Sequence, residues 1–189
     1  MTTMATMPKE KITNGVNVTK LAETIRAVRQ QPELADFKFR ARNKWFTGGQ
    51  NQAEISDYYG TCQEMQSREK PFTMDLDEPP VLLGEDKGPN PVEVLLAALS
   101  GCMTTTLAYH AASRGLNLQK VESEYEGDID LNGFLDIDPN VRKGYQEIRV
   151  KFRVKGDADA EKVRELVQKS PVFDSISKGV PIKIMVETV

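Results

Sequence analysis

The sequence contains few of the side chains that build metal centres and disulfide scaffolds. It has two cysteines, Cys62 and Cys102, and one histidine, His110. The cysteines form no C-x-x-C pair, which excludes a disulfide framework and a cysteine-rich zinc site. A single imidazole also argues against a zinc or iron site built on histidines. We therefore expect neither a metal nor a cofactor.

A strong excess of charge and a secretion signal are also lacking. The net charge of −3 gives no basic surface of the kind that binds nucleic acid. The first residues, MTTMATMPKEK, contain no apolar run typical of a signal peptide, so we expect a cytoplasmic protein. The 189 residues suffice for one hydrophobic core. We expect an N-terminal extension with one helix at residues 1–34 and one domain at residues 35–189.

One long apolar helix, Pro91–Arg114, dominates what is present. Asn90 is a good N-cap, and Glu93 lies in the first turn, where the helix dipole favours an acid. Gly115 follows the last helical residue, as a C-terminal cap should. Val94–Ala112 carries no formal charge and is apolar on every side. Such a helix either spans a membrane or is buried in a soluble core.

The membrane alternative is the weaker one. Val94–Ala112 is close to the minimum length for a span, but it contains several hydroxyl residues and a histidine. The sequence has no second segment of this kind and no aromatic belt. We predict a core helix of a soluble protein without a membrane contact. One sheet and two short helices would leave parts of this helix uncovered, so we expect a homodimer.

Two strands after this helix show complementary charge. Val121–Leu131 places acidic side chains on one face, and Ile148–Lys155 places basic side chains on one face with apolar residues opposite. This pattern predicts antiparallel neighbours with cross-strand ion pairs.

The remaining elements are shorter. Apolar spacing predicts a helix at Val18–Gln31 that packs through Leu21, Ile25 and Val28. The other predicted elements are a half-buried strand at Ala35–Phe46, a turn at Gly48-Gly49, strands at Glu54–Tyr59 and Phe72–Leu76, a helix from Asp157 to Lys169, a turn at Val172–Lys178 and a strand through Ile182, Ile184 and Val186. About seven strands and three main helices, not in βαβα order, indicate an α+β fold with antiparallel sheet.

The segment Asn90–Cys102, NPVEVLLAALSGC, resembles the NPxEhhhAAxxxC segment of the OsmC/Ohr family, the osmotically inducible and organic hydroperoxide resistance proteins. The resemblance extends to the turn Thr47–Gly49 and to Ser170-Pro171-Val172, and it spans Ala35–Val189. It implies an intertwined homodimer in which antiparallel sheets surround two long central helices. It also implies two active sites at the dimer interface.

In the family's peroxidases, a cysteine on the central helix reduces a hydroperoxide. An arginine and a glutamate activate it, and a second cysteine resolves the sulfenic acid. Cys102 matches the reactive cysteine. Val92 stands at the glutamate position with Glu93 one residue on, Gln50 stands at the arginine position, and Ser170 replaces the resolving cysteine. Other cations that could assist are Arg40, Arg42 and Arg68.

Two functions stay open. The first is a hydroperoxide reductase that uses Cys102 and an external thiol reductant. The second is a non-catalytic module that binds a small apolar ligand at the dimer interface. In either case Val81, Leu82 and Leu83 are expected to line an apolar pocket. Cys62 is expected to be an ordinary buried side chain and dispensable. His110 lies about 12 Å along the helix from Cys102, too far for a dyad within one chain.

Overall fold

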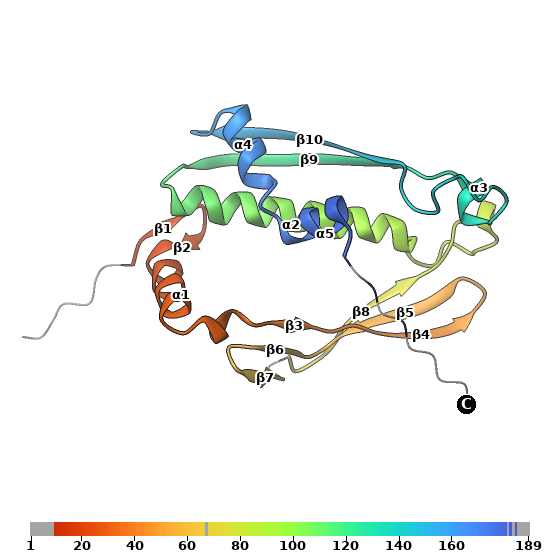
Figure 1. Ribbon diagram of the computed structural model, residues 1–189, viewed down its shortest axis with the longest axis horizontal. Coiled ribbons are helices and arrows are strands. Elements are labelled where there is room, and N and C mark those ends of the chain that lie inside the picture. The colour runs from red at the N-terminus through yellow and green to blue at the C-terminus, as the bar shows by residue number, and fades with distance from the viewer. Residues whose placement is uncertain (1–9, 67, 181, 183, 185–189) are drawn as a thin grey trace, which may run out of the picture. The chain divides into compact units, whose positions relative to one another are not determined.

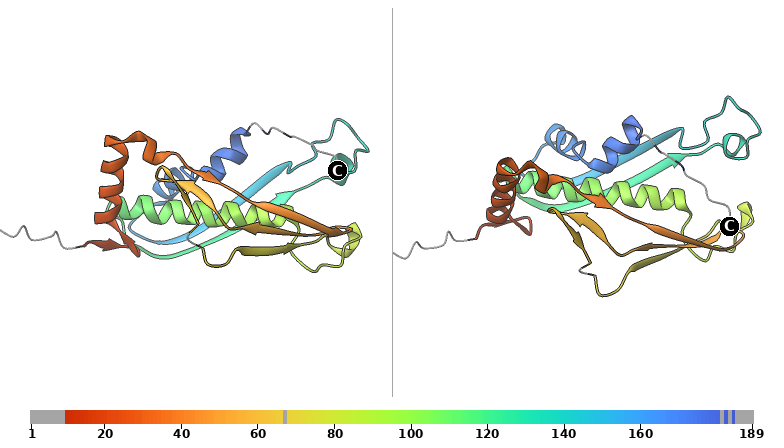
Figure 2. Two further views of the ribbon diagram at one scale, coloured as in Figure 1. Left: turned by 90° about the horizontal axis from the view of Figure 1, so that it is seen from below. Right: turned by 60° about the horizontal axis from the view of Figure 1, so that its bottom comes forward.

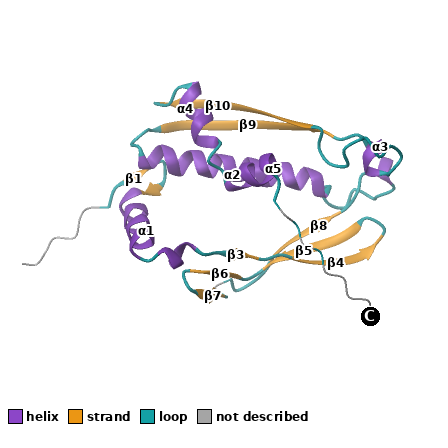
Figure 3. Cartoon of the chain, viewed as in Figure 1, coloured by secondary structure: helices purple, strands orange, loops and turns teal. Residues whose placement is uncertain are grey.

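The computed structural model describes residues 10–66, 68–180, 182 and 184 (Figure 1). The chain divides into two compact units. The first unit comprises Met1–Ile12 and Asn17–Leu95, and the second comprises Thr13–Val16 and Leu96–Val189. Each unit contains antiparallel sheet and helix, so the predicted α+β class is confirmed (Figure 3).

The first unit contains two three-stranded antiparallel sheets. One has the order β4-β5-β8, with β4 at Arg42–Thr47, β5 at Gln50–Ile55 and β8 at Phe72–Leu76. The other has the order β3-β6-β7, with β3 at Lys38–Phe39, β6 at Tyr58–Gly60 and β7 at Gln63–Met65.

The strand predicted at Phe72–Leu76 and the Gly48-Gly49 turn are confirmed. The single strand predicted at Ala35–Phe46 is wrong, because the chain leaves one sheet after Phe39 and enters the other at Arg42. It is not half-buried either, since all six residues of β4 are exposed. The strand predicted at Glu54–Tyr59 is likewise divided between β5 and β6.

The helix of the first unit, α1, runs from Val18 to Gln30, as the sequence predicts. Asn17 caps it, because its side chain accepts a hydrogen bond of 3.0 Å from the backbone N–H of Lys20. None of its residues is buried, and Ile25 on the predicted packing face is 43% exposed. Two short 3₁₀ helices, η1 at Pro32–Ala35 and η2 at Pro80–Leu82, complete this unit.

The long helix α2 runs from Pro91 to Ser113, which confirms the prediction. In the second unit the strands β9, Leu118–Asp128, and β10, Glu147–Gly156, run alongside it (Figures 1 and 2). The helix presents a buried stripe at helical spacing: Leu99, Met103, Leu107 and Ala111. Partly buried residues of both strands pack against this stripe to form the core.

The predicted charge pairing of β9 and β10 is confirmed. The strands are antiparallel, with Arg149 opposite Glu126 and Lys151 opposite Glu124. Arg149 forms ion pairs with Glu126 and Asp128, and Arg153 pairs with Glu124 at 2.6 Å. These side chains are exposed, so each pair adds little stability and the pattern mainly fixes the register. A small helix, α3 at Leu131–Phe134, follows β9.

The helix after β10 begins later than predicted. α4 spans Ala160–Val167, and its cap is Asp159, whose carboxylate accepts from the backbone N–H of Lys162 at 2.8 Å. Asp157 does not cap it, because this carboxylate accepts both the backbone and side-chain N–H groups of Asn117 at the start of β9. The inward face predicted for α4 is confirmed, since Val163, Leu166 and Val167 are buried.

The turn predicted at Val172–Lys178 is wrong, because α5 occupies Pro171–Lys178 as a helix. Ser170 is its N-cap, with Pro171 at the first position, which suits proline's fixed φ angle. Gly179 ends the helix with φ of 70°. The strand predicted through Ile182, Ile184 and Val186 falls largely outside the described residues.

The sequence interpretation missed a short hairpin before α1. β1, Ile12–Thr13, and β2, Val16–Asn17, flank an Asn14-Gly15 turn with positive φ at both positions. Asn-Gly is the strongest short signal for such a turn. Within the second unit, Asn14 donates to the carbonyl of Leu116 at 2.9 Å and accepts from the N–H of Leu118 at 2.8 Å.

The core packing yields a stability prediction. Leu166 is completely buried between α4 and the stripe of α2, so Leu166→Ala should lower the free energy of unfolding by about 2–5 kcal/mol. Leu83→Ala is the matched control, because Leu83 is 94% exposed and its loss should change stability by less than about 0.5 kcal/mol. Urea denaturation measures both. Equal effects of the two substitutions would contradict this description of the core.

Candidate functional site

Cys102 lies near the middle of α2, in the second unit. It is partly exposed, and it neighbours Met103, which is 4% exposed within the buried stripe. The preceding Gly101 is exposed, and a Cβ added there would meet no atom within 4 Å. The thiol is therefore reachable at the edge of the buried stripe, as a reactive cysteine requires.

Arg40 and Arg42, the first candidate cations, are already paired with acids in the first unit. Arg40 donates hydrogen bonds to Glu64 from both terminal nitrogens, at 2.7 and 2.9 Å, and to Asp57 at 2.9 Å. Arg42 binds Asp57 at 2.6 Å and the hydroxyl of Ser56 at 3.0 Å. Hydrogen bonds from Arg42, Ser56 and Arg40 hold the pKa of the Asp57 carboxyl well below its usual range. The positive charges of Arg40 and Arg42 are therefore largely balanced by these carboxylates.

Arg68 is held differently. Its guanidinium lies over the rings of Tyr58 and Phe72, with distances of 5.6 and 5.1 Å to the ring centroids. Its Nη1 atom is buried and has no hydrogen-bond partner among the described residues. Of the three candidate arginines, it is the one whose charge no carboxylate balances in the described part of the chain.

The loop before α2 is organised by a residue that the sequence interpretation missed. Asp77 is 1% exposed, and its carboxylate accepts the backbone N–H groups of Glu78, Glu85 and Lys87 at 2.8–3.2 Å. Burial raises the pKa of Asp77, but these hydrogen bonds outweigh it and the pKa is lowered. Gly84 is required here, because a Cβ would lie 1.7 Å from the carbonyl oxygen of Glu78.

This loop delivers the start of α2. The side chain of Asn90 accepts from the N–H of Val92 at 2.9 Å, and Glu93 accepts from the N–H of Asn90 at 2.9 Å. This reciprocal pair is a capping box. Asn90 also donates to Glu78, and Gln50 donates to Glu85 of the same loop at 3.1 Å. Glu93 therefore stabilises the N-terminus of α2, and Gln50 stabilises the loop before it. Both roles are structural.

The other predicted site residues differ in burial. Ser170 is completely buried, and its hydroxyl accepts from the N–H of Phe173 at 3.2 Å. Val81 and Leu83 are 82% and 94% exposed, and Leu82 is partly exposed, in the η2 turn.

The surroundings of His110 favour its neutral form, and the expected burial of Cys62 is wrong. Burial and the nearby charge of Arg114 lower the pKa of His110, and Arg114 Nη1 lies 3.1 Å from its Nδ1. Both effects favour the neutral form of the imidazole. Cys62 is exposed rather than buried, in the tight turn between β6 and β7 with φ of 63°.

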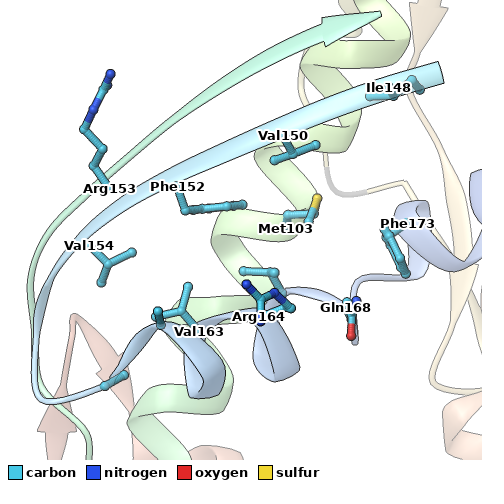
Figure 4. Close-up of a pocket in the computed structure, with 13 residues that line it drawn as sticks. Met103, Ile148, Val150, Phe152, Arg153, Val154, Val163, Arg164, Gln168 and Phe173 are labelled. Carbon is cyan, nitrogen blue, oxygen red and sulfur yellow. The ribbon is translucent and has the colours of Figure 1, made fainter.

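A pocket of about 700 Å³ lies in the second unit, formed by residues of α2, β10, α4 and α5 (Figure 4). Its lining is mostly apolar and includes Met103 but not Cys102. Among the described residues, no cluster of three or more His, Cys, Asp or Glu side chains could hold a metal ion.

The sequence of the chain identifies its family. The model of the OsmC-like protein family matches residues 84–185, and the chain belongs to this family. None of the curated protein sequences compared with this chain matches it significantly.

Two solved structures show the same fold. An OsmC-like protein from Mycoplasma pneumoniae is 17% identical, covers 76% of this chain and 89% of its own, and has a TM-score of 0.56. An OsmC-like protein of unknown function from Vibrio cholerae is 13% identical. The alignment covers 73% of this chain and 92% of that protein, with a TM-score of 0.54.

The helix α2 is long and apolar enough to cross a membrane by composition alone, a test that core helices of soluble proteins also pass. Membership of the OsmC-like family indicates a soluble protein.

The buried carboxylate yields a pH-dependent prediction. Asp77→Asn should lower the urea midpoint at pH 7, because the amide cannot replace a carboxylate that accepts three N–H groups. The lowered pKa of Asp77 gives stability that is present above its unfolded-state pKa and lost as pH falls through the folded-state value. The difference between variant and wild type should therefore shrink below about pH 4. Asp86→Asn, an exposed change in the same loop, should match the wild type throughout.

Proposed function

We propose that the protein is a thiol-dependent reductase of organic hydroperoxides in which Cys102 is the reacting group. The observation that carries the proposal is the partly exposed thiol at this position of α2, within the segment that matches the OsmC-like family. The hydroperoxide resistance known in the OsmC/Ohr branch supports the choice of oxidant. The proposed compartment is the cytoplasm, where small thiols are available as reductant.

The reaction uses one protein thiol, Cys102, and two external thiols that supply the two reducing equivalents. The Cys102 thiolate attacks the terminal oxygen of the hydroperoxide, the O–O bond breaks, and the leaving alkoxide takes a proton to become an alcohol. The resulting sulfenic acid condenses with an external thiol to a mixed disulfide and water. A second external thiol then releases Cys102 and carries away the disulfide. Ser170 cannot take part as a resolving residue, because a hydroxyl forms no disulfide.

The alternative function is a non-catalytic binding module. It is favoured by the pairing of Arg40 and Arg42 with carboxylates and of Glu93 with the helix cap, which leaves Arg68 as the one candidate cation without a carboxylate partner among the described residues. In that case Cys102 is a packing residue at the edge of the core. Activity measurements separate the two functions.

Hydroperoxide consumption tests the proposal directly. With cumene hydroperoxide and excess dithiothreitol, the wild type should consume peroxide, and Cys102→Ser should fall to the uncatalysed rate. Cys62→Ser is the matched control and should stay within about twofold of the wild type. Consumption that survives in Cys102→Ser would refute the proposal, and its absence in a folded wild type would favour the binding module.

The proposed assembly is a homodimer. The apolar helix α2 exposes Leu95 by 39% and Tyr109 by 50%, and exposed apolar surface of this kind can mark a protein–protein interface. Sedimentation velocity at low micromolar concentration should show a dimer. A folded monomer under these conditions would contradict the proposal.

A further inference from the structure

The pocket of the second unit combines an apolar interior with one unbalanced cation. Its volume of about 700 Å³ is typical of sites that hold small organic ligands. The apolar lining comes from Met103, Ile148, Val150, Phe152, Val154, Ala158, Ala160, Val163, Val167 and Phe173. The side chains of β10 lie on one side and those of α4 on the other, with Met103 between them (Figure 4).

The polar lining is limited to three side chains, and they are not equivalent. Arg153 points away from the other lining residues and pairs with Glu124 (Figure 4). Arg164 on α4 and Gln168, the residue that caps the end of this helix, lie one turn apart, so both face the same region. Arg164 is exposed and makes no ion pair within the described chain, although its neighbour Glu165 is paired with Lys162 and Lys169. The pocket therefore has one free guanidinium and an amide at one end.

We propose that this pocket binds an unbranched carboxylic acid of medium chain length. The alkyl chain lies among the apolar side chains of β10 and α4, where its burial removes apolar surface from water. The guanidinium of Arg164 receives the carboxylate in a bidentate pair, and the amide of Gln168 donates to it. A highly charged ligand such as a nucleotide would leave most of its polar groups unpaired in this lining.

This inference goes beyond the proposed function and does not depend on it. Cys102 is not among the lining residues, although Met103 is. Successive residues of a helix are separated by about 100°, so the thiol and the thioether face different directions. A carboxylic acid bound here is a ligand and not an oxidant of Cys102.

Calorimetric titration of the full chain tests the ligand class. Octanoate, decanoate and dodecanoate, each below its micelle concentration, should bind with affinity that rises roughly an order of magnitude for every two methylenes. Decanol, which has the same chain without the carboxylate, should bind about tenfold or more weakly than decanoate. Equal binding of decanol and decanoate would refute the role of Arg164, and no binding of any of them would refute the proposal.

Variants locate the site. Arg164→Gln should weaken decanoate binding about tenfold or more and leave decanol unchanged. Arg26→Gln, which removes the same charge from the exposed surface of α1, is the matched control and should bind like the wild type. Val150→Trp should abolish binding, because Val150 lines the pocket and is 38% exposed, so a larger ring can fill the space. Cys102→Ser should bind decanoate normally, which separates this site from the proposed peroxide site.

A nuclear magnetic resonance signal of the wild type reports ligand binding directly. The ε-methyl resonance of Met103, assigned by Met103→Leu, should shift on addition of decanoate to the wild type. Methionines outside the pocket serve as internal controls in the same spectrum. Binding that leaves the Met103 signal unchanged, or that is unaffected by both Arg164→Gln and Val150→Trp, would overturn the proposal.

Discussion

The constraint on which the second unit depends is that the long apolar helix α2 must bury one face in a core. One stripe of α2, from Leu99 to Ala111, is buried against β9, β10 and α4. Fully burying one such aliphatic side chain contributes about 1.5–3 kcal/mol, more than an exposed ion pair contributes. The length of β9 and β10 follows from the same need, since both strands run along the helix (Figure 2).

Charge serves two different purposes in the two units. On β9 and β10 it forms exposed pairs such as Arg153 with Glu124, which select the register at little gain in stability. In the first unit, Asp77 is a buried charge whose partners are backbone N–H groups, and removing it would leave those donors without acceptors. The loop that this carboxylate organises leads to the Asn90 cap of α2. The entrance of the helix thus depends on an acid that carries no reactive role.

Sequence patterns predicted the elements whose signals are periodic or repeated. The bounds of α2 follow from its cap and its uncharged interior, and the β9–β10 register follows from opposite charges at every second residue. The role of Asp77 could not be predicted, because its partners are backbone groups that leave no mark in side-chain identity. The sequence places two aspartates, Asp157 and Asp159, near the start of α4, and only their tertiary contacts show that Asp159 is the cap.

The sequence placed Cys102 on the long helix. It did not show that the residues expected to assist Cys102 form hydrogen bonds with other groups. Arg40, Arg42 and Glu93 each have partners from distant or backbone positions, which periodicity does not reveal. The Asn14-Gly15 turn was the reverse case, since its signal was present and a polar N-terminal segment concealed it. The pocket is set by the packing of α4 and α5 on β10, which no single segment encodes.

The protein contains its own control for the central claim that Cys102 is chemically reactive. Cys62 is exposed in a turn, whereas Cys102 is only partly exposed, so accessibility alone favours oxidation of Cys62. If the surroundings of Cys102 activate it, a hydroperoxide supplied below one equivalent will oxidise Cys102 first. Trapping the sulfenic acid with dimedone, followed by peptide mass spectrometry, measures the ratio at the two positions. We expect the label mainly on Cys102, and label mainly on Cys62 would contradict the proposed reactivity of Cys102.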